Sequence, residues 1–112
     1  MPRIDKIAFS FRAPAGTALP GGVVTGVMLN AGGSVIPSGT AAGNGAVGVV
    51  CPGGTIAAGR IISVLVKGEI VDFGGTVSGT YYAGTAATVD TTSTNGVAVG
   101  FTVEADRLIV SM

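Results

Sequence analysis

The chain has 112 residues, which is enough for one domain of ordinary size and too few for two. Its six basic and six acidic side chains cancel, and this balance gives no overall attraction to nucleic acid or to anionic lipid. The 20 glycines disfavour helices, and the lack of histidine removes the usual general base and the common zinc ligand of enzymes.

Charged residues are scarce and unevenly placed. They make up 11% of the chain, where soluble domains carry roughly 25%. No acidic or basic residue occurs between Arg12 and Arg60, although a domain this small leaves much of its chain at the surface. An uncharged surface of this kind indicates burial against other subunits. A membrane span is excluded, because glycine or proline breaks every apolar stretch well short of the roughly 20 residues required.

The first segment differs from the uncharged stretch that follows it. Residues 1–12 hold four of the twelve charged side chains, and Ile7, Phe9 and Phe11 alternate with smaller residues, which is the period of a strand. We therefore predict an N-terminal arm over 1–12 that ends in a strand and is suited to pairing with a partner's sheet edge, followed by a single β-domain over 13–112. The apolar run of this segment is too short for a signal-peptide core, so we expect synthesis in a cytoplasm.

Short apolar runs bounded by Gly, Pro or Asn turns follow along the rest of the chain. Strands are predicted at 23–29, 46–50, 60–73, 80–83, 97–103 and 107–112. Within the longest run, Gly68 lies between Lys67 and Glu69 and predicts a bulge, a bend or a tight turn. The residues 104–106 predict the turn of a closing hairpin. Several short strands at this spacing favour a compact barrel or sandwich.

One motif resembles a nucleotide-binding fingerprint but lacks its context. Gly43, Gly45 and Gly48 fit the pattern G-x-G-x-x-G, and Glu69 lies about 20 residues further on. The fingerprint requires a helix to begin at this point, whereas the chain continues into Val-Val-Cys-Pro. We interpret the motif as a turn.

Other candidates for chemistry also have a structural explanation. Glu104 and Asp106 could form a carboxylate pair, but Arg107 is adjacent and the segment has the character of a solvated turn. Cys51 has no basic neighbour to lower its pKa, so we expect a small buried hydrophobic residue rather than a reactive thiol. Tyr81 and Tyr82 would face opposite sides of a strand, one inward and one outward. We expect no enzymatic activity, no metal and no cofactor.

From about Ala46 to its end the chain resembles the capsid decoration, or cement, proteins of tailed bacteriophages. The residues that carry this resemblance form four segments: Val47-Gly48-Val49-Val50, the run from Ala58 to Glu69, Ser78-Gly79-Thr80-Tyr81-Tyr82, and the run from Val99 to Val110. Many relatives have Trp where this chain has Phe101, a change that keeps the apolar character. The stretch from Pro14 to Gly45 matches much less clearly.

The resemblance implies an all-β fold, a small compact glycine-rich β-barrel or sandwich of β-tulip or β-clip character with an N-terminal arm. It further implies a structural virion protein that binds the outer surface of an assembled phage capsid and reinforces the shell. The partners would be the major capsid protein and further copies of the chain, as a homotrimer, with no nucleic acid and no membrane. The expected capsid-binding residues are Arg3, Ile4, Asp5, Lys6, Ile7, Phe9, Phe11 and Arg12. The alternative is a small β-clip-like module that recognises a carbohydrate or a peptide.

Overall fold

Every regular element of the described chain is a β-strand. The computed structural model describes residues 2–30, 32–39, 45–75, 79–84, 87–91, 93 and 96–112. The strands are β1 (Arg3–Pro14), β2 (Thr25–Leu29), β3 (Val35–Pro37), β4 (Gly48–Val50), β5 (Ile61–Val71), β6 (Thr80–Gly84), β7 (Gly96–Glu104) and β8 (Arg107–Ser111). Within these residues no helix is long and apolar enough to cross a membrane.

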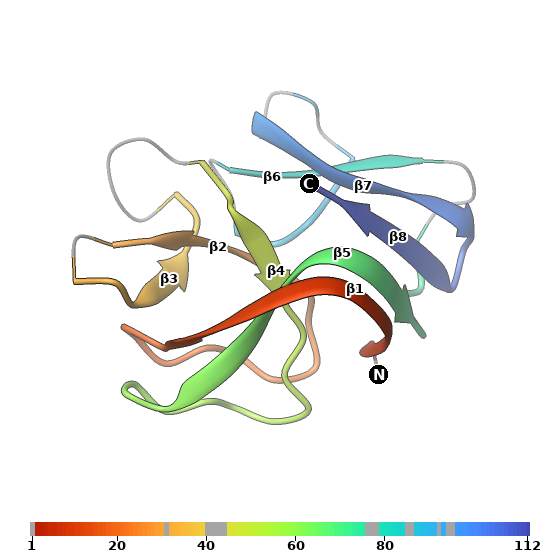
Figure 1. Cartoon of the computed structure of the whole chain (residues 1–112). Helices are drawn as coiled ribbons and strands as arrows, with labels where there is room; N and C mark the ends of the chain where they lie inside the picture. The colour runs from red at the N-terminus through yellow and green to blue at the C-terminus, as the bar shows by residue number, and fades with distance from the viewer. Residues whose placement is uncertain are drawn as a thin grey trace.

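The strands form a single antiparallel sheet that is strongly curled. The order along the sheet is β3-β2-β4-β5-β8-β7-β6, and β1 pairs with β5 outside this path. Figure 1 shows the sheet bent into a half-open barrel, with β2 and β3 on one side and the β6-β7-β8 meander on the other. This architecture confirms the predicted small all-β barrel or sandwich.

The strand β3 is the one element that the sequence pattern did not indicate. It spans three residues and follows the turn after β2, where the Asn30 side-chain oxygen accepts hydrogen bonds from the backbone N–H groups of Gly32 (2.9 Å) and Ser34 (3.2 Å). Gly33 lies in the same turn with φ of 83°, a conformation that favours glycine. A strand this short leaves too few residues for an alternating pattern to be recognised.

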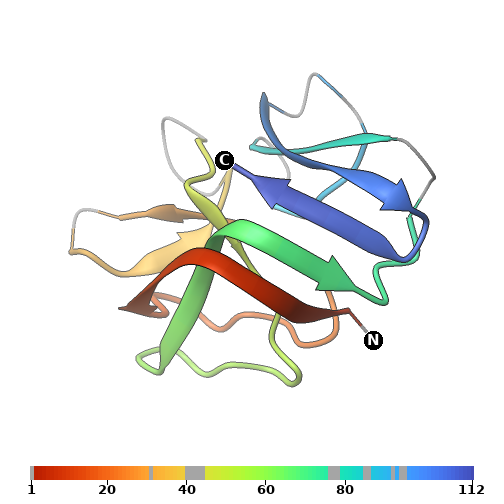
Figure 2. The same ribbon diagram turned by 45° about the vertical axis from the view of Figure 1, so that its right-hand side comes forward.

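The long strand β5 connects the two halves of the sheet. One edge pairs with β1 along its whole length, while the other pairs with β4 at Leu65 and then with β8 from Lys67 to Val71. The strand bends between these two partners, and β1 follows the same curve (Figure 2). Gly68 pairs with Ile7, and the ladder shifts register between Ile7 and Phe9 and again between Phe9 and Ser10. Of the three alternatives for Gly68, the bulge agrees with these register shifts, whereas the tight turn is wrong, because β5 runs unbroken from Ile61 to Val71.

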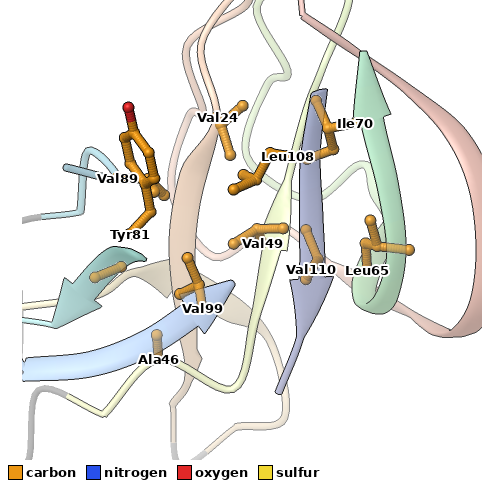
Figure 3. Close-up of a cluster of buried hydrophobic side chains, with 11 residues drawn as sticks. Val24, Ala46, Val49, Leu65, Ile70, Tyr81, Val89, Val99, Leu108 and Val110 are labelled. Carbon is orange, nitrogen blue, oxygen red and sulfur yellow. The ribbon is translucent and has the colours of Figure 1, made fainter. Parts of the chain in front are cut away.

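Two hydrophobic cores pack against β5 from opposite faces. Leu65 belongs to the larger core, which is formed by Val24, Ala46, Val49, Leu65, Ile70, Tyr81, Ala83, Val89, Val99, Leu108 and Val110 (Figure 3). Val64 belongs to the smaller core, which is formed by Ala13, Ala15, Leu19, Val27, Val35, Val50 and Val64. Because successive side chains of a strand point to opposite faces, β5 is covered on both sides at this point.

The C-terminal half contains the predicted hairpin and the tyrosine pair. The β7 and β8 strands are joined by a turn at residues 105–106, as expected. Tyr81 is buried in the larger core with its ring edge-on to Phe73, at a centroid distance of 4.8 Å, whereas Tyr82 is only half-buried. The two tyrosines therefore face opposite sides of β6, as the sequence predicted.

Candidate functional site

The most distinctive surface is the outer face of the β1-β5-β8-β7 part of the sheet. Cross-strand partners share a face of a sheet, and one row of such partners runs from Lys6 through Glu69 and Ile109 to Phe101. The next row along runs from Phe9 through Lys67 to Ser111. The outer face is defined here by these seven residues: Lys6, Phe9, Lys67, Glu69, Phe101, Ile109 and Ser111. Its neighbours on the opposite side, such as Ile70 and Leu108, are fully buried.

A shallow groove crosses this outer face where three strands meet. It has a volume of about 420 Å³ and is lined by Lys6, Ile7 and Ala8 of β1, Lys67, Gly68 and Glu69 of β5, and Ile109, Val110 and Ser111 of β8. The groove lies beside Gly68, where a side-chain Cβ would overlap the carbonyl oxygen of Lys6. The glycine therefore permits the close approach of β1 and β5 that shapes the groove floor.

The expected capsid-binding residues of the arm all lie in β1, but only some are available for contact. Ile4 packs against the larger core and Phe11 against the smaller one, so both contribute to folding. Ile7 and Phe9 are 58% and 55% exposed, which is unusual for large apolar side chains in the middle of a strand. The available apolar surface of β1 is therefore its central part, next to the groove.

The charged residues of β1 fall into two groups. Arg3 forms an ion pair with Asp72 at 3.0 Å, and Lys6 lies 3.7 Å from Glu69. In the described part of the chain, the side chains of Asp5 and Arg12 form no ion pair and no hydrogen bond. Both side chains are exposed, so they remain open to a partner.

The remaining charges around the outer face are mostly compensated within the chain. Arg107 donates to Glu69 at 3.3 Å and to Glu104 at 2.8 Å, and these hydrogen bonds raise the pKa of the Arg107 guanidinium. Lys67 donates to the backbone carbonyl of Met112 at 3.0 Å. A partner that covers this face therefore meets apolar side chains and ion pairs that are already formed.

Within the described residues, the side chains that could have formed a catalytic or metal-binding site have structural roles instead. Glu104 is engaged by Arg107, and Asp106 lies in the β7–β8 turn. Cys51 packs against the larger core, and burial raises the pKa of its thiol. The described residues contain no cluster of three side chains suited to holding a metal ion. Of the G-x-G-x-x-G motif, Gly43 and the residue after it lie outside the described residues, and Gly48 begins β4 rather than a helix.

A second hollow lies among residues that flank the strands. It has a volume of about 260 Å³ and is lined by Pro2, Gly22, Val23, Val24, Phe73, Thr88 and Val89. None of these side chains ionises, so the hollow offers only apolar contact and hydrogen bonds.

Five residues of the outer face were not among the expected site residues: Lys67, Glu69, Phe101, Ile109 and Ser111. Phe101 is 47% exposed, and its alternation with Thr102 in β7 was visible in the sequence. The sequence could not show that β7 and β8 are placed on the same face as β1, because that placement depends on the pairing of both β8 and β1 with β5.

The fold places the chain in the class of small all-β domains built on one curled sheet. This fold can be compared with those of known proteins. No protein-family model matches the chain, and no curated protein matches it. Among solved structures, a chain from Mycobacterium phage Patience superimposes with a TM-score of 0.85 at 16% sequence identity, covering 98% of this chain and 95% of that one. At this identity the likeness shows a shared fold over nearly the whole of both chains.

Proposed function

We propose that the protein is a structural component of a phage virion that binds the outer surface of an assembled capsid and reinforces the shell by bridging capsomers. The observation that carries the proposal is the pair Ile7 and Phe9, two large apolar side chains left exposed beside a shallow groove. Exposed apolar patches on small domains commonly mark protein interaction sites. The fold shared with a phage chain and the sequence resemblance to decoration proteins support the capsid as the partner.

The contact with the capsid is assigned to the outer face rather than to the whole of β1. Ile4 and Phe11 are engaged in the cores, and Arg3 and Lys6 have partners in the chain. Phe9 and Phe101 supply the apolar area of the outer face, and Ile7 adds an exposed apolar side chain that lines the groove. Exposed ion pairs contribute little to affinity, so the apolar residues carry most of the binding energy in this proposal.

Self-association belongs to the same proposal. We expect a homotrimer, in which three outer faces engage the shell together. Linking three weak sites raises the effective concentration at each one, so modest contacts per subunit are enough for stable attachment and neighbouring capsomers become tied together.

The alternative is a module that recognises a carbohydrate or a peptide, and one observation favours it. Sugar sites commonly use an aromatic ring as a platform, and the structure exposes both Phe9 and Phe101 near a groove of about 420 Å³. The sequence pattern did not indicate two exposed aromatic rings on one face. A glycan or peptide bound by the purified chain without any shell would favour this alternative.

Co-sedimentation with empty shells of the phage that encodes the chain tests the proposal. We expect the wild-type protein to sediment with the shells, and the double variant Ile7→Ser/Phe9→Ser to bind at least about tenfold more weakly, because hot-spot residues dominate interface energies. Both side chains are exposed, so the variant should fold.

The matched control is Leu29→Ser, which removes a 47% exposed apolar side chain from β2, outside the outer face. It should bind the shells as the wild type does. Absence of wild-type binding would overturn the capsid proposal, and equal binding by the double variant would overturn the assignment to the outer face.

A further inference from the structure

The charged residues are divided by sign between two parts of the chain. Residues 10–66 contain two of them, Arg12 and Arg60, and both are basic. The remaining residues contain four basic and six acidic side chains, so a charge of +2 on one part is balanced by −2 on the other. The net charge of zero therefore conceals a separation of charge within the molecule.

The long β1–β5 ladder separates these charges in space. Arg12 lies two residues before the end of β1 and Arg60 immediately before the start of β5, so both arginines are at the same end of the antiparallel ladder. Asp5 lies near the start of β1, toward the other end, where the β7–β8 turn with Asp106 also lies (Figure 1, Figure 2). There the backbone N–H of Phe73, just after β5, donates to the carbonyl oxygen of Asp106 at 3.0 Å.

The charges at the two ends are not neutralised within the chain. Among the described residues, the side chains of Asp5, Arg12, Arg60 and Asp106 form no ion pair and no hydrogen bond, and all four are exposed. The ion pairs of β1, β5 and β8 described above leave these four side chains over. Each end of the ladder thus keeps two free charges of one sign.

Each end also exposes apolar side chains beside its charges. Ile61 follows Arg60, is 61% exposed and pairs across the ladder with Pro14, which is also exposed. Val103 is 45% exposed and lies in β7, next to the turn that holds Asp106. We call these two surfaces the basic end, formed by Arg12, Pro14, Arg60 and Ile61, and the acidic end, formed by Asp5, Val103 and Asp106. Protein interfaces commonly combine an apolar centre with a polar rim.

We propose that copies of the chain associate head to tail, with the basic end of one copy against the acidic end of the next. Two positive charges then meet two negative ones, whereas two like ends repel each other, so the charges select this orientation. A second copy is the partner to which the complementarity points, because it carries the same number of opposite charges together with an exposed apolar side chain.

A head-to-tail contact joins two different surfaces, so it produces a ring or an open chain of copies. The strands β1 and β5 are arched in both views, and the two ends of the ladder turn toward one side of the molecule (Figure 1, Figure 2). This arch favours closure into a ring. The number of three copies in the ring rests on the proposed function, whereas the contact itself does not depend on the capsid.

Charge reversal at each end tests the contact by analytical ultracentrifugation of the purified protein without shells. We expect the wild type to associate, as a trimer if the proposed function holds. The variant Arg12→Glu/Arg60→Glu has two acidic ends, and Asp5→Lys/Asp106→Lys has two basic ends. Each variant alone should associate at least about tenfold more weakly than the wild type, because its ends repel each other.

An equal mixture of the two reversed variants distinguishes this contact from other modes of association. Every contact between unlike variants joins opposite charges, so association should return. The two variants must alternate around a ring, and a ring of three cannot alternate. The restored species should therefore contain an even number of copies.

The control Leu29→Glu/Val47→Glu adds two acidic charges at exposed apolar positions outside both ends, and it should keep the wild-type mass. A monomeric wild type, a reversed variant that associates normally on its own, or a mixture that stays dissociated would overturn the head-to-tail contact. The residues Ile7, Phe9 and Phe101 are unchanged in all these variants and no shell is present. Failure of this contact is therefore distinct from failure of capsid binding, which co-sedimentation measures.

Discussion

At the scale of single residues, two glycines allow strands to approach more closely than any side chain would permit. A Cβ atom at Gly68 would overlap the carbonyl oxygen of Lys6, and one at Gly100 would overlap the carbonyl oxygen of Ile109. Both glycines lie in strands, where glycine is otherwise unfavourable because it packs no side chain. The curl of the sheet therefore depends on the lack of a side chain at these positions.

The variant Gly100→Ala tests this dependence. We expect a loss of about 2–3 kcal/mol in the free energy of unfolding, since the added methyl group can be accommodated only by a shift of the β8 backbone. Urea denaturation measures it. Gly54→Ala serves as the control, because Gly54 is exposed and nothing lies within 4 Å of an added Cβ. Equal stability of the two variants would contradict the explanation.

At the scale of elements, β1 combines folding and binding in one strand. Ile4 and Phe11 contribute to the two cores, and Ile7 and Phe9 between them remain exposed. The alternation of apolar residues in the sequence marked the strand correctly but did not distinguish these roles. The distinction arises because register shifts in the β1–β5 ladder change which side chains face inward.

A pair of phenylalanine variants separates the two roles. Phe11→Ala should lower the free energy of unfolding by about 2 kcal/mol, because Phe11 packs against the smaller core. Phe9→Ala should change it by no more than about 0.5 kcal/mol. Thermal and urea unfolding of both proteins provide the comparison. A larger loss at Phe9 than at Phe11 would show that the register differs from the one described.

Local patterns in the sequence predicted most of the strands, whereas the residues that share one face of the sheet depend on how the strands pair. The runs around Ile70, Val99 and Leu108 were visible as strands because apolar residues recur between glycine turns. The outer face was not predictable, since Lys6, Glu69, Ile109 and Phe101 come together only through three strand pairings. The lack of histidine and the single cysteine already limited the possible catalytic and metal-binding chemistry in the sequence. That Asp5 and Arg12 are free of ion pairs among the described residues could be seen only once the structure showed which charged residues of β1 are paired.

At the scale of the whole molecule, β5 makes the two cores interdependent. Val64 and Leu65 are consecutive and fully buried, one in each core. Neither core can lose β5 while the other remains intact. Small single domains of this size commonly unfold in one transition, and the shared strand gives this chain a structural reason to do so.

The variant Val64→Ala affects the smaller core. We expect it to lower the midpoint of urea unfolding by the same amount whether unfolding is followed by tyrosine fluorescence or by far-UV ellipticity. The loss should be about 2 kcal/mol, from two methyl groups and the cavity they leave. Tyr81 reports on the larger core, so a shift at this residue shows coupling between the cores. Leu65→Ala is the matched change within the larger core. Separate midpoints for the two signals in Val64→Ala would indicate independent cores.

The full-length pairing of β1 with β5 gives the molecule a preferred direction of mechanical strength. A force applied along these two strands in opposite senses loads the hydrogen bonds of the ladder from Arg3 to Pro14 together, so that none can break alone. A force applied across the strands instead opens the same bonds one after another from an end. Attachment through the centre of β1 would therefore resist shearing tension far better than peeling.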